Sequence, residues 1–365
     1  RKGGFYHDTG EGSISRYHRE PGGDLVWEVA SGYFGCRNPD GSFNPDMFRQ
    51  NATLEQVKMI EVKLSQGAKP GHGGILPGEK VTRETAEARG VQMGEDCISP
   101  ASHSAFSNPV ELLEFLDQLR ELSGGKPVGF KLAIGHPWEW FAIVKAMLAT
   151  GKKPDFIVVD GGEGGTGAAP LEFINRLGMP LTEALLLVHN TLVGANLRED
   201  IAIGAAGKIT SAFNIARTLA LGADWCNAAR GYMFALGCIQ ALNCHTGRCP
   251  SGVATQDPRR GNKLDVPLKS ERVYNFHKNT LDALQNLLEA SGLKHPSELG
   301  PEHIVRRVSK TEVHSYLDLF PFLEPGALLE GKTGLTVFDK YWDDARADTF
   351  EPPEFILKLR ETKLR

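Results

Sequence analysis

The sequence predicts an α/β fold, either a (β/α)8 barrel or a doubly wound parallel sheet. Between residues 1 and 230, short β-rich runs alternate with helical patterns, as in repeated βα units. Several predicted strands are also nearly continuous apolar runs, which is typical of parallel strands covered on both faces. Seven strands are predicted, one fewer than a barrel needs. We therefore expect a (β/α)8 TIM barrel whose first strand lies upstream of Arg1.

The predicted strands follow one another at the spacing of βα units. The clearest is FIVV at 156–159, in which every residue is apolar. Amphipathic stretches with apolar residues at helical spacing lie between strands, at Pro109–Leu122, Trp138–Leu148 and Ala212–Leu221. In chain order the predicted strands are Gly4–His7, Met59–Leu64, Asp96–Ile98, Val128–Leu132, Phe156–Val159, Ile201–Ala205 and Trp225–Ala228.

We expect two parts in the chain. Residues 1–290 form the barrel domain, which includes a cysteine-containing loop at 237–258 and ends with a strongly amphipathic helix at Lys269–Ala290. Gly292 ends that helix. Residues 291–365 are rich in charges and interrupted by proline, which predicts a peripheral C-terminal extension.

Composition and charge exclude several classes of function. Of 365 residues, 41 are basic and 45 acidic, and the net charge of −4 provides no basic surface for nucleic acid. No apolar run approaches the roughly 18 residues of a membrane span, so we expect no membrane segment in this chain. Cys36, Cys97 and Cys226 are scattered, unlike a secreted disulfide framework. We therefore predict a reducing, cytoplasmic location.

Three more cysteines, Cys238, Cys244 and Cys249, lie together with the spacing C-x5-C-x4-C. Three buried free thiols within twelve residues would be unusual, although cysteine is often buried. Zinc would require His245 as a fourth ligand, and its position next to Cys244 would strain a tetrahedral site. Thiolates are the usual ligands of iron–sulfur clusters. The spacing therefore favours a cluster that lacks one iron corner.

A glycine-rich loop, GGEGGTGAAP at 161–170, follows the predicted strand FIVVD. Gly162, Gly164 and Gly167 match the G-x-G-x-x-G pattern of dinucleotide-binding folds, which makes a nicotinamide-dependent dehydrogenase one interpretation. A tight βα turn that needs positive φ angles is another. So many glycines in one loop, Gly165 included, favour a third interpretation, in which a flat ring or a phosphate approaches the backbone.

Two later loops predict a phosphate site. AAGKITSAF at 205–213 follows the strand IAIGA and begins a helix, and CNAARGYM at 226–233 follows the last strand. In barrels, the loops after strands 7 and 8 commonly bind phosphate through backbone N–H groups. Lys208 and Arg230 would add positive charge there. The alternative is two ordinary loops with solvated cations.

Lys131 is a candidate ligand-facing residue in the predicted strand VGFKLAI. A buried lysine must find a partner or lose its charge, and at the carboxyl end of a barrel strand it would point at the ligand. The alternative is a lysine whose ammonium group reaches solvent from a strand end. The loop at 63–78, with Gln66, Lys69 and His72 among several glycines, also has the composition of a ligand-facing loop.

Seven segments together carry a family resemblance. They are CIQALNCHTGRCPSGVATQ at 238–256, DTGEG at 8–12, VASGYFG at 29–35, QGAKPGHGGILPG at 66–78, ISP at 98–100, FKL at 130–132 and GGTGAAP at 164–170. In sequence, order and spacing, over roughly residues 3–258, they resemble the synthase region of glutamate synthase large subunits. The chain is most similar to the shorter, stand-alone FMN-binding members of that family.

The resemblance implies a barrel that binds FMN at the carboxyl ends of its strands, with a nearby [3Fe-4S] cluster that passes electrons to the flavin. Reduced FMN would deliver hydride to 2-iminoglutarate, formed from 2-oxoglutarate and ammonia. Lys131 then matches a catalytic lysine beside flavin and substrate, and Cys238, Cys244 and Cys249 match the cluster ligands. The positions expected at the FMN ring and phosphate are Gln66, Lys69, Lys131, Gly164, Gly165, Gly167, Gly207, Lys208, Ala228, Ala229 and Arg230.

Some residues depart from the family pattern. His72 replaces a glutamate, and the bulky run AIGHPWEW at 133–140 replaces a glycine-rich stretch, so a related 2-oxo acid is an alternative to 2-oxoglutarate. No glutaminase domain is recognisable in these residues. We therefore expect a separate amidotransferase to supply ammonia, and a ferredoxin or reductase subunit to supply electrons. The alternatives are a nicotinamide-dependent dehydrogenase, or a degenerate barrel that serves as an electron-transfer or interaction subunit.

Overall fold

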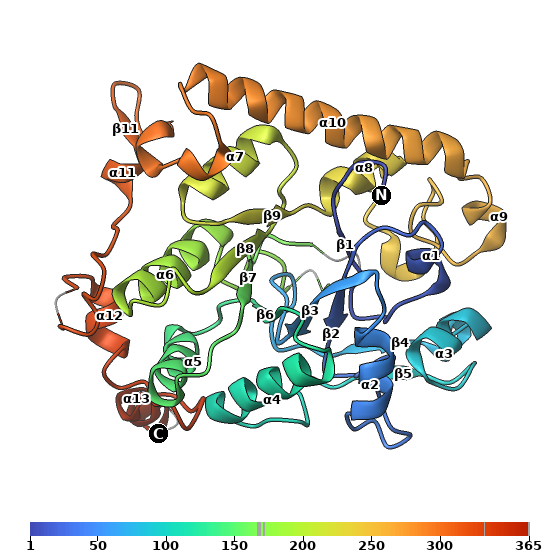
Figure 1. Cartoon of the computed structure of the whole chain (residues 1–365), viewed down its shortest axis with the longest axis horizontal. Helices are drawn as coiled ribbons and strands as arrows, with labels where there is room; N and C mark the ends of the chain where they lie inside the picture. Colours follow the sequence, from blue (N-terminus) through green and yellow to red (C-terminus); the bar gives the residue numbers. More distant parts are fainter. Residues whose placement is uncertain (166–168, 171, 332, 364–365) are drawn as a thin grey trace.

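The fold is a curled parallel β-sheet with helices on its outer side (Figure 1). The computed structural model describes residues 1–165, 169–170, 172–331 and 333–363. The sheet has the strand order β1-β2-β3-β6-β7-β8-β9, and every neighbouring pair is parallel. Its strands are β1 His7–Asp8, β2 Leu25–Val29, β3 Val57–Lys63, β6 Val128–Leu132, β7 Phe156–Asp160, β8 Ala202–Ala206 and β9 Trp225–Asn227.

The strand order is that of a barrel rather than of a doubly wound sheet. The strands follow chain order from one edge to the other, so the order never reverses within the described sheet. Among the described residues, β1 and β9 form the two edges and do not pair with each other. The Tyr6 hydroxyl donates a hydrogen bond to Asn227 Oδ1, which links these edges. The predicted (β/α)8 barrel is therefore confirmed in part, as a curled parallel half-barrel sheet.

The prediction that Asp96–Ile98 is a barrel strand is wrong. These residues overlap β5 (Cys97–Ser99), which pairs antiparallel with β4 (Gly74–Leu76) in an arm outside the main sheet. With Ile98 57% exposed, β5 lacks the covered faces of a central strand. The main sheet contains β2 instead, a strand missing from the prediction because Glu28 interrupts its apolar run. The other predicted strands differ from the observed ones by no more than three residues at either end.

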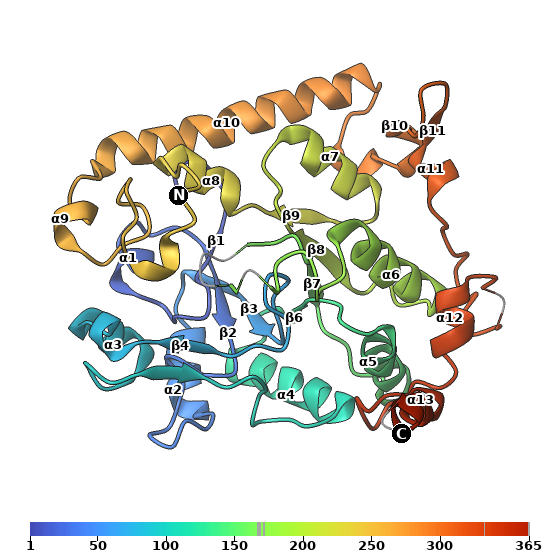
Figure 2. The same cartoon turned by 180° about the vertical axis from the view of Figure 1, so that it is seen from behind.

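The apolar core lies between the sheet and its outer helices. These helices are α4 (Pro109–Leu122), α5 (Pro137–Thr150), α6 (Leu181–Gly194) and α7 (Ala212–Ala220) (Figures 1 and 2). Trp27, Ile60 and Phe130, on the outer face of the strands, are fully buried in one core cluster with helix residues. Since apolar packing occupies the outer face, the inner face is free to carry polar side chains.

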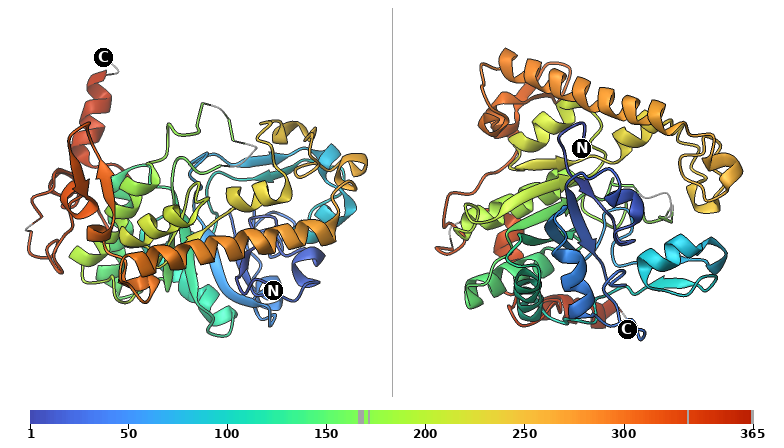
Figure 3. Two further views of the ribbon diagram at one scale, coloured as in Figure 1. Left: turned by 90° about the horizontal axis from the view of Figure 1, so that it is seen from above. Right: turned by 45° about the vertical axis from the view of Figure 1, so that its right-hand side comes forward.

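The C-terminal third covers the outside of the sheet and its helices. The helix α10 (Val266–Ala290) begins three residues before its predicted start and lies across α7 and α8 (Arg230–Leu236), as Figure 3 shows. Further along, Asn190 of α6 donates a hydrogen bond to the Pro321 carbonyl at 2.9 Å, and Phe338 of α12 (Thr336–Tyr341) stacks on Phe141 of α5. The extension thus shares the core cluster, and a boundary at residue 290 remains a prediction.

The remaining helices and strands are short or peripheral. None of the helices in the described part of the chain combines the length and apolar character needed to cross a membrane. These further elements are α1 Arg16–Arg19, α2 Pro45–Ala52, α3 Arg83–Arg89, α9 Pro258–Gly261, β10 Val305–Arg307, β11 Val313–Ser315, α11 Tyr316–Leu319 and α13 Glu354–Lys363.

Candidate functional site

The inner face of the sheet carries charged side chains near the carboxyl ends of its strands. Side chains alternate between the two faces of a strand, and the parallel register places Glu28 beside Glu61 and Lys63 beside Lys131. These four residues of β2, β3 and β6 therefore point inward in two adjacent layers. Asp8 of β1 lies on the same face.

Together these five residues form what we call the inner cluster. Lys131 Nζ forms an ion pair with Glu28 Oε2 and lies 3.1 Å from Glu61 Oε1. Lys63 Nζ lies 3.5 Å from the other Glu28 oxygen. The side chains of Glu28 and Glu61 are only 3% and 1% exposed, and carboxylate oxygens of Asp8, Glu28 and Glu61 lie within 4.8 Å of one another. The ammonium groups of the chain itself therefore neutralise part of this buried negative charge.

The members of the inner cluster differ in their pKa shifts. Burial raises the pKa of Glu61 well above its ordinary value, against the opposing charge of Lys131. Burial acts on Glu28 in the same direction, but the charges of Lys131 and Lys63 outweigh it and lower the Glu28 pKa. Burial also disfavours the charged form of Lys131, yet Glu28 and Glu61 raise its pKa well above the ordinary value. Lys131 is therefore an ammonium ion.

The Lys131 side chain is 14% exposed and its ammonium group is paired with Glu28 and Glu61, so the alternative of an ammonium group that reaches solvent is wrong. Its role toward a ligand remains a prediction. Glu28 and Glu61 are missing from the predicted site, although they show the signal that singled out Lys131. Each is a charged residue inside a short apolar strand, in the runs LVWEV and MIEVK. A charge at such a position needs a partner, and here the partners of Glu28 and Glu61 include Lys131 of the predicted site.

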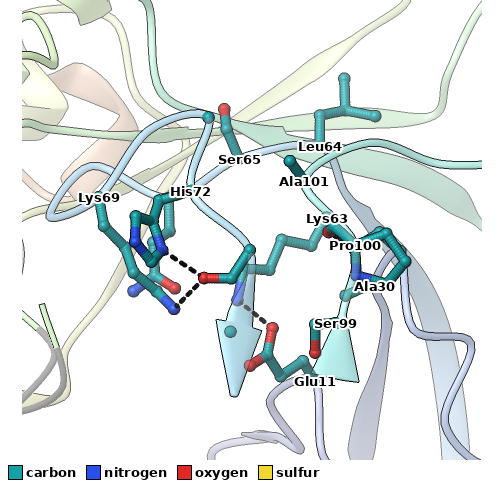
Figure 4. Close-up of a pocket in the computed structure, with 15 residues that line it drawn as sticks. Glu11, Ala30, Lys63, Leu64, Ser65, Lys69, His72, Ser99, Pro100 and Ala101 are labelled. Atoms are coloured by element: carbon teal, nitrogen blue, oxygen red, sulfur yellow. Dashed lines mark hydrogen bonds and ion pairs between the residues drawn. The ribbon is translucent and has the colours of Figure 1, made fainter.

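Gln66 and Lys69 line a small pocket that Lys63 of the inner cluster also lines. Figure 4 shows Lys69 and Lys63 in this pocket. Lys69 Nζ donates to the Gly73 carbonyl at 3.2 Å, and Lys63, which also lines the pocket, donates to Glu11 at 2.9 Å. The volume of about 30 Å³ admits roughly one water molecule. The pocket by itself therefore suits a small polar or anionic group.

A second cavity, of about 870 Å³, brings together predicted residues from three loops. Gly164 and Gly165 follow β7, Lys208 follows β8, and Arg230 begins α8. A Cβ atom at Gly165 would lie 2.7 Å from Arg230 Nη2, so glycine makes room for the guanidinium group. The volume is within the range of cofactor sites. We call this space the large cavity; Gln66, Lys69 and Lys131 do not line it.

Three other predicted cofactor residues lie elsewhere. Gly207, Ala228 and Ala229 are described but are not among the residues that line the large cavity. Gly207 has a φ of 146° next to Lys208, a conformation that favours glycine, and Ala229 is the N-cap of α8. Gly167 lies outside the described residues.

All three cysteines of the 237–258 loop line the large cavity, and their thiols are free. The Ser251 hydroxyl lies 3.4 Å from Cys249 Sγ. This hydrogen bond, supported by nearby backbone N–H groups, lowers the pKa of the Cys249 thiol to about 7. Cys249 is thus substantially a thiolate at neutral pH, and the thiolate is the form that binds metal.

The described loop does not have the geometry of a zinc site. No three of the side chains of Cys238, Cys244, His245 and Cys249 bring their ligand atoms within 4.8 Å of one another, as one tetrahedral ion would require. In an iron–sulfur cluster, by contrast, different thiolates bind different irons, so the sulfur atoms lie further apart.

The helix that follows the glycine loop does not support the interpretation as a nicotinamide-dependent dehydrogenase. In a dinucleotide fold the glycine pattern leads directly into a helix whose N-terminus faces the pyrophosphate. Here the Gly162 amide donates to the Met179 carbonyl at 2.8 Å, and α6 begins only at Leu181. The described part of the loop therefore folds back across the strand end instead of entering a helix.

Comparison with known proteins identifies the family. A family model described as "Conserved region in glutamate synthase" matches residues 1–294. The chain belongs to the glutamate synthase family. It is 44% identical over 305 residues to the glutamate synthase large subunit-like protein YerD of Bacillus subtilis, covering 84% of this chain and 58% of that protein. It is 36% identical over 291 residues to the archaeal glutamate synthase (NADPH) of Methanocaldococcus jannaschii, covering 80% and 54%.

The chain spans just over half the length of these two relatives. A third member of the family, the ferredoxin-dependent glutamate synthase of Antithamnion sp., is 33% identical over 274 residues, which is 75% of this chain and 17% of that protein. Among solved structures, a mutant flavocytochrome b2 with benzoylformate has a TM-score of 0.48 at 13% identity, covering 81% of this chain and 59% of that one.

In this glutamate synthase family member, we expect His103 to make stability depend on pH. His103 is 8% exposed, and its ring nitrogens lie 2.8 Å from the Lys63 carbonyl and 3.1 Å from the Tyr33 hydroxyl. Burial lowers the His103 pKa to about 4. Below pH 6.5 the unfolded chain binds a proton that the folded chain excludes, so stability should fall by up to about 1.4 kcal/mol per pH unit from pH 6.5 toward 5.

Urea unfolding at pH 7.5, 6.5, 5.5 and 5.0 measures this dependence. His189 has its pKa lowered to about 4 for the same reason, so His103→Gln should remove only about half of the slope. The exposed His314→Gln should leave the slope unchanged. An unaltered slope in His103→Gln would contradict the assignment.

Proposed function

We propose that the chain is the FMN- and [3Fe-4S]-binding part of an oxidoreductase of the glutamate synthase type. Its reaction is the reductive amination of 2-oxoglutarate, or a related 2-oxo acid, with ammonia by way of the imino acid. The single observation that carries this proposal is the large cavity, because residues expected at FMN and all three expected cluster ligands line it. The family membership supports 2-oxoglutarate as the first substrate to test.

The residues of the large cavity have the chemistry that both groups need. Lys208 and Arg230 provide positive charge for the FMN phosphate, and Gly164 and Gly165 let a flat ring approach the backbone. We also assign Gly167, Gly207, Ala228 and Ala229 to the FMN loops, and Gln66 and Lys69 to the ring side. The ligands of the cluster would be Cys238, Cys244 and Cys249. When bound, FMN supplies hydride transfer and the cluster supplies single electrons.

Lys131 is the proposed catalytic residue. Its ammonium group can stabilise negative charge on a bound group or pair with a substrate carboxylate. The inner cluster that contains it borders the small pocket through Lys63, and Lys63 and Lys131 share the partner Glu28. The same ion pairs hold the Lys131 side chain in place, which keeps the charge where it is needed.

The bulky run AIGHPWEW does not obstruct either cavity. His136 stacks on Trp138 with ring centroids 4.1 Å apart, and Trp138 packs against Tyr341 of α12. Both residues lie at the start of α5, and neither lines the small pocket or the large cavity. His136 and Trp138 therefore lie away from both cavities, on the side of the C-terminal extension.

Anaerobic purification followed by absorbance spectroscopy tests the proposal. Flavin bands with a broad iron–sulfur shoulder are expected, and a featureless spectrum would favour the degenerate barrel. Turnover of 2-oxoglutarate with ammonia is then assayed with reduced ferredoxin and with NADPH plus a reductase, because relatives are named for both donors. Flavin bands without turnover would leave FMN binding in place and move the search to other 2-oxo acids, with an amidotransferase as the ammonia source.

We expect Arg230→Ala to weaken FMN binding by about tenfold or more. The guanidinium group at the cavity wall would otherwise make charge-assisted hydrogen bonds to the phosphate, worth about 1.5–3 kcal/mol. Titration of FMN-depleted protein, followed by quenching of flavin fluorescence, measures the affinity. Arg259→Ala is the matched control, since the Arg259 side chain is 91% exposed outside the cavity. Equal FMN affinities of Arg230→Ala and the unaltered protein would contradict the assignment.

A further inference from the structure

Among the carboxyl groups of the inner cluster, Glu61 has the fewest contacts that would stabilise a negative charge. Lys131 Nζ lies 3.1 Å from Glu61 Oε1, but this buried oxygen accepts no well-directed hydrogen bond. Glu28, by contrast, has an ammonium group beside each of its oxygens, from Lys131 and Lys63. Asp8 Oδ1 accepts the backbone N–H of Gly10 at 2.8 Å. The burial of a negative charge on Glu61 is therefore unfavourable, because few contacts compensate for the lost hydration.

The proximity of Glu61 to Glu28 also indicates that Glu61 is protonated. The two residues are neighbours in the β2–β3 register, with carboxylate oxygens within 4.8 Å. Two buried carboxylates this close repel each other, so one of them is favoured in its neutral, protonated form. Since Glu28 has an ammonium group beside each of its oxygens, Glu61 is the one that keeps the proton.

The balance of charges around Glu61 favours one protonated carboxyl group. Asp160 of β7 is a fourth inward carboxyl group, and it accepts the Gly67 N–H at 2.9 Å. Four inward carboxyl groups, of which Glu28 and Glu61 are buried, thus face two ammonium groups, one of which is shared with Glu11. The charged and titratable groups that face Glu61 from the packed strands and their flanking segments are Tyr6, Asp8, Glu28, Lys63 and Lys131.

We propose that Glu61 is a carboxylic acid held between Glu28 and Lys131, and that it returns a proton to Lys131 when Lys131 gives one to a bound ligand. The O–H bond of Glu61 breaks as an N–H bond forms at Lys131 Nζ, and no electrons are transferred. Lys131 becomes an ammonium ion again, and Glu61 becomes a carboxylate paired with it. Glu61 is thus a positioning residue that stores a proton. The transfer step rests on the proposed function, in which Lys131 is the residue beside the substrate, and adds to it that Lys131 donates a proton.

The stored proton can be measured without FMN or substrate. Infrared difference spectroscopy between neutral and alkaline pH should show the carbonyl stretch of a protonated carboxylic acid, shifted in D2O. The band should be absent in Glu61→Gln and present in Glu11→Gln, which alters a carboxylate that is partly exposed at the pocket. A band that is absent from the unaltered protein, or that persists in Glu61→Gln, overturns the assignment.

A second measurement needs no variant. In protein labelled with 13C at the glutamate side-chain carboxyl carbon, one signal should keep the chemical shift of a protonated acid through neutral pH. If every glutamate has the shift of a carboxylate at pH 7, the proposal is wrong even if Glu61→Gln fails to fold.

The transfer step has its own readout. With the holoenzyme, Glu61→Gln should reduce turnover by roughly 10²-fold, as for loss of a proton donor, while the rate of FMN reduction by the electron donor stays unchanged. Unchanged turnover would overturn the transfer step. An inactive unaltered enzyme that still shows the infrared band would refute the proposed function alone, because the band is recorded without any ligand.

Discussion

Replacing Lys131 with methionine should lower turnover by about 10²–10³-fold and the free energy of unfolding by about 3–5 kcal/mol. The loss of turnover follows from the proposed role of its ammonium group in stabilising negative charge on a bound group. The loss of stability follows from the inner cluster, because methionine leaves the buried Glu28 carboxylate without its closest partner. Methionine keeps most of the volume of the lysine stem, so packing changes little.

Two measurements separate these effects. Urea unfolding gives the stability, and anaerobic stopped-flow reduction of bound FMN by a chemical or ferredoxin donor gives the rate of flavin reduction, with steady-state assays for turnover. Adding Glu28→Gln to Lys131→Met should restore much of the stability but none of the turnover, since the unpaired charge is removed and the ammonium group is still absent. Lys58→Met, at a lysine 50% exposed on β3, should change stability by less than about 0.5 kcal/mol. Stability and turnover that both match the unaltered protein would refute the role of Lys131.

Replacing Cys244 with serine should remove the iron–sulfur absorbance and most of the iron from anaerobically purified protein. A hydroxyl group is a much poorer cluster ligand than a thiolate, and Cys238 and Cys249 alone leave the cluster one ligand short. The fold should remain, because Cys244 lies on the wall of the large cavity, outside the apolar core. Circular dichroism and urea unfolding should therefore match those of the unaltered protein.

The control for Cys244→Ser is the same change at Cys226. Burial raises the pKa of Cys226 to about 12, and this thiol does not line the large cavity, so it lies apart from the three proposed cluster ligands. Iron content and labile sulfide should be unchanged in Cys226→Ser and lost in Cys244→Ser. Stoichiometric zinc without iron in the unaltered protein would contradict the cluster assignment.

The features that the sequence predicts correctly are those that depend on neighbouring residues in the chain. The run VGFKL gives β6 its predicted bounds, and the apolar spacing of Pro109–Leu122 gives α4 both of its ends. Side-chain alternation and helical spacing are local properties, so composition along a short window reveals them. The three cysteines and the glycine loop stand out in the sequence for the same reason, since each motif lies within a few residues, and their roles remain predictions.

The inner cluster depends instead on contacts that no short window contains. Lys131 and Glu28 are 103 residues apart in the chain, and they meet because the register of β2, β3 and β6 turns both side chains to the inner face. Likewise, β5 has strand-forming residues, but its place in a separate arm is set by its partner β4. Pairing between distant strands is chosen by the packing of the whole sheet, because shifting a strand by one residue would turn every buried side chain to the opposite face. The sequence by itself therefore determined the βα alternation and the motifs, and the tertiary structure decided which charges share the interior.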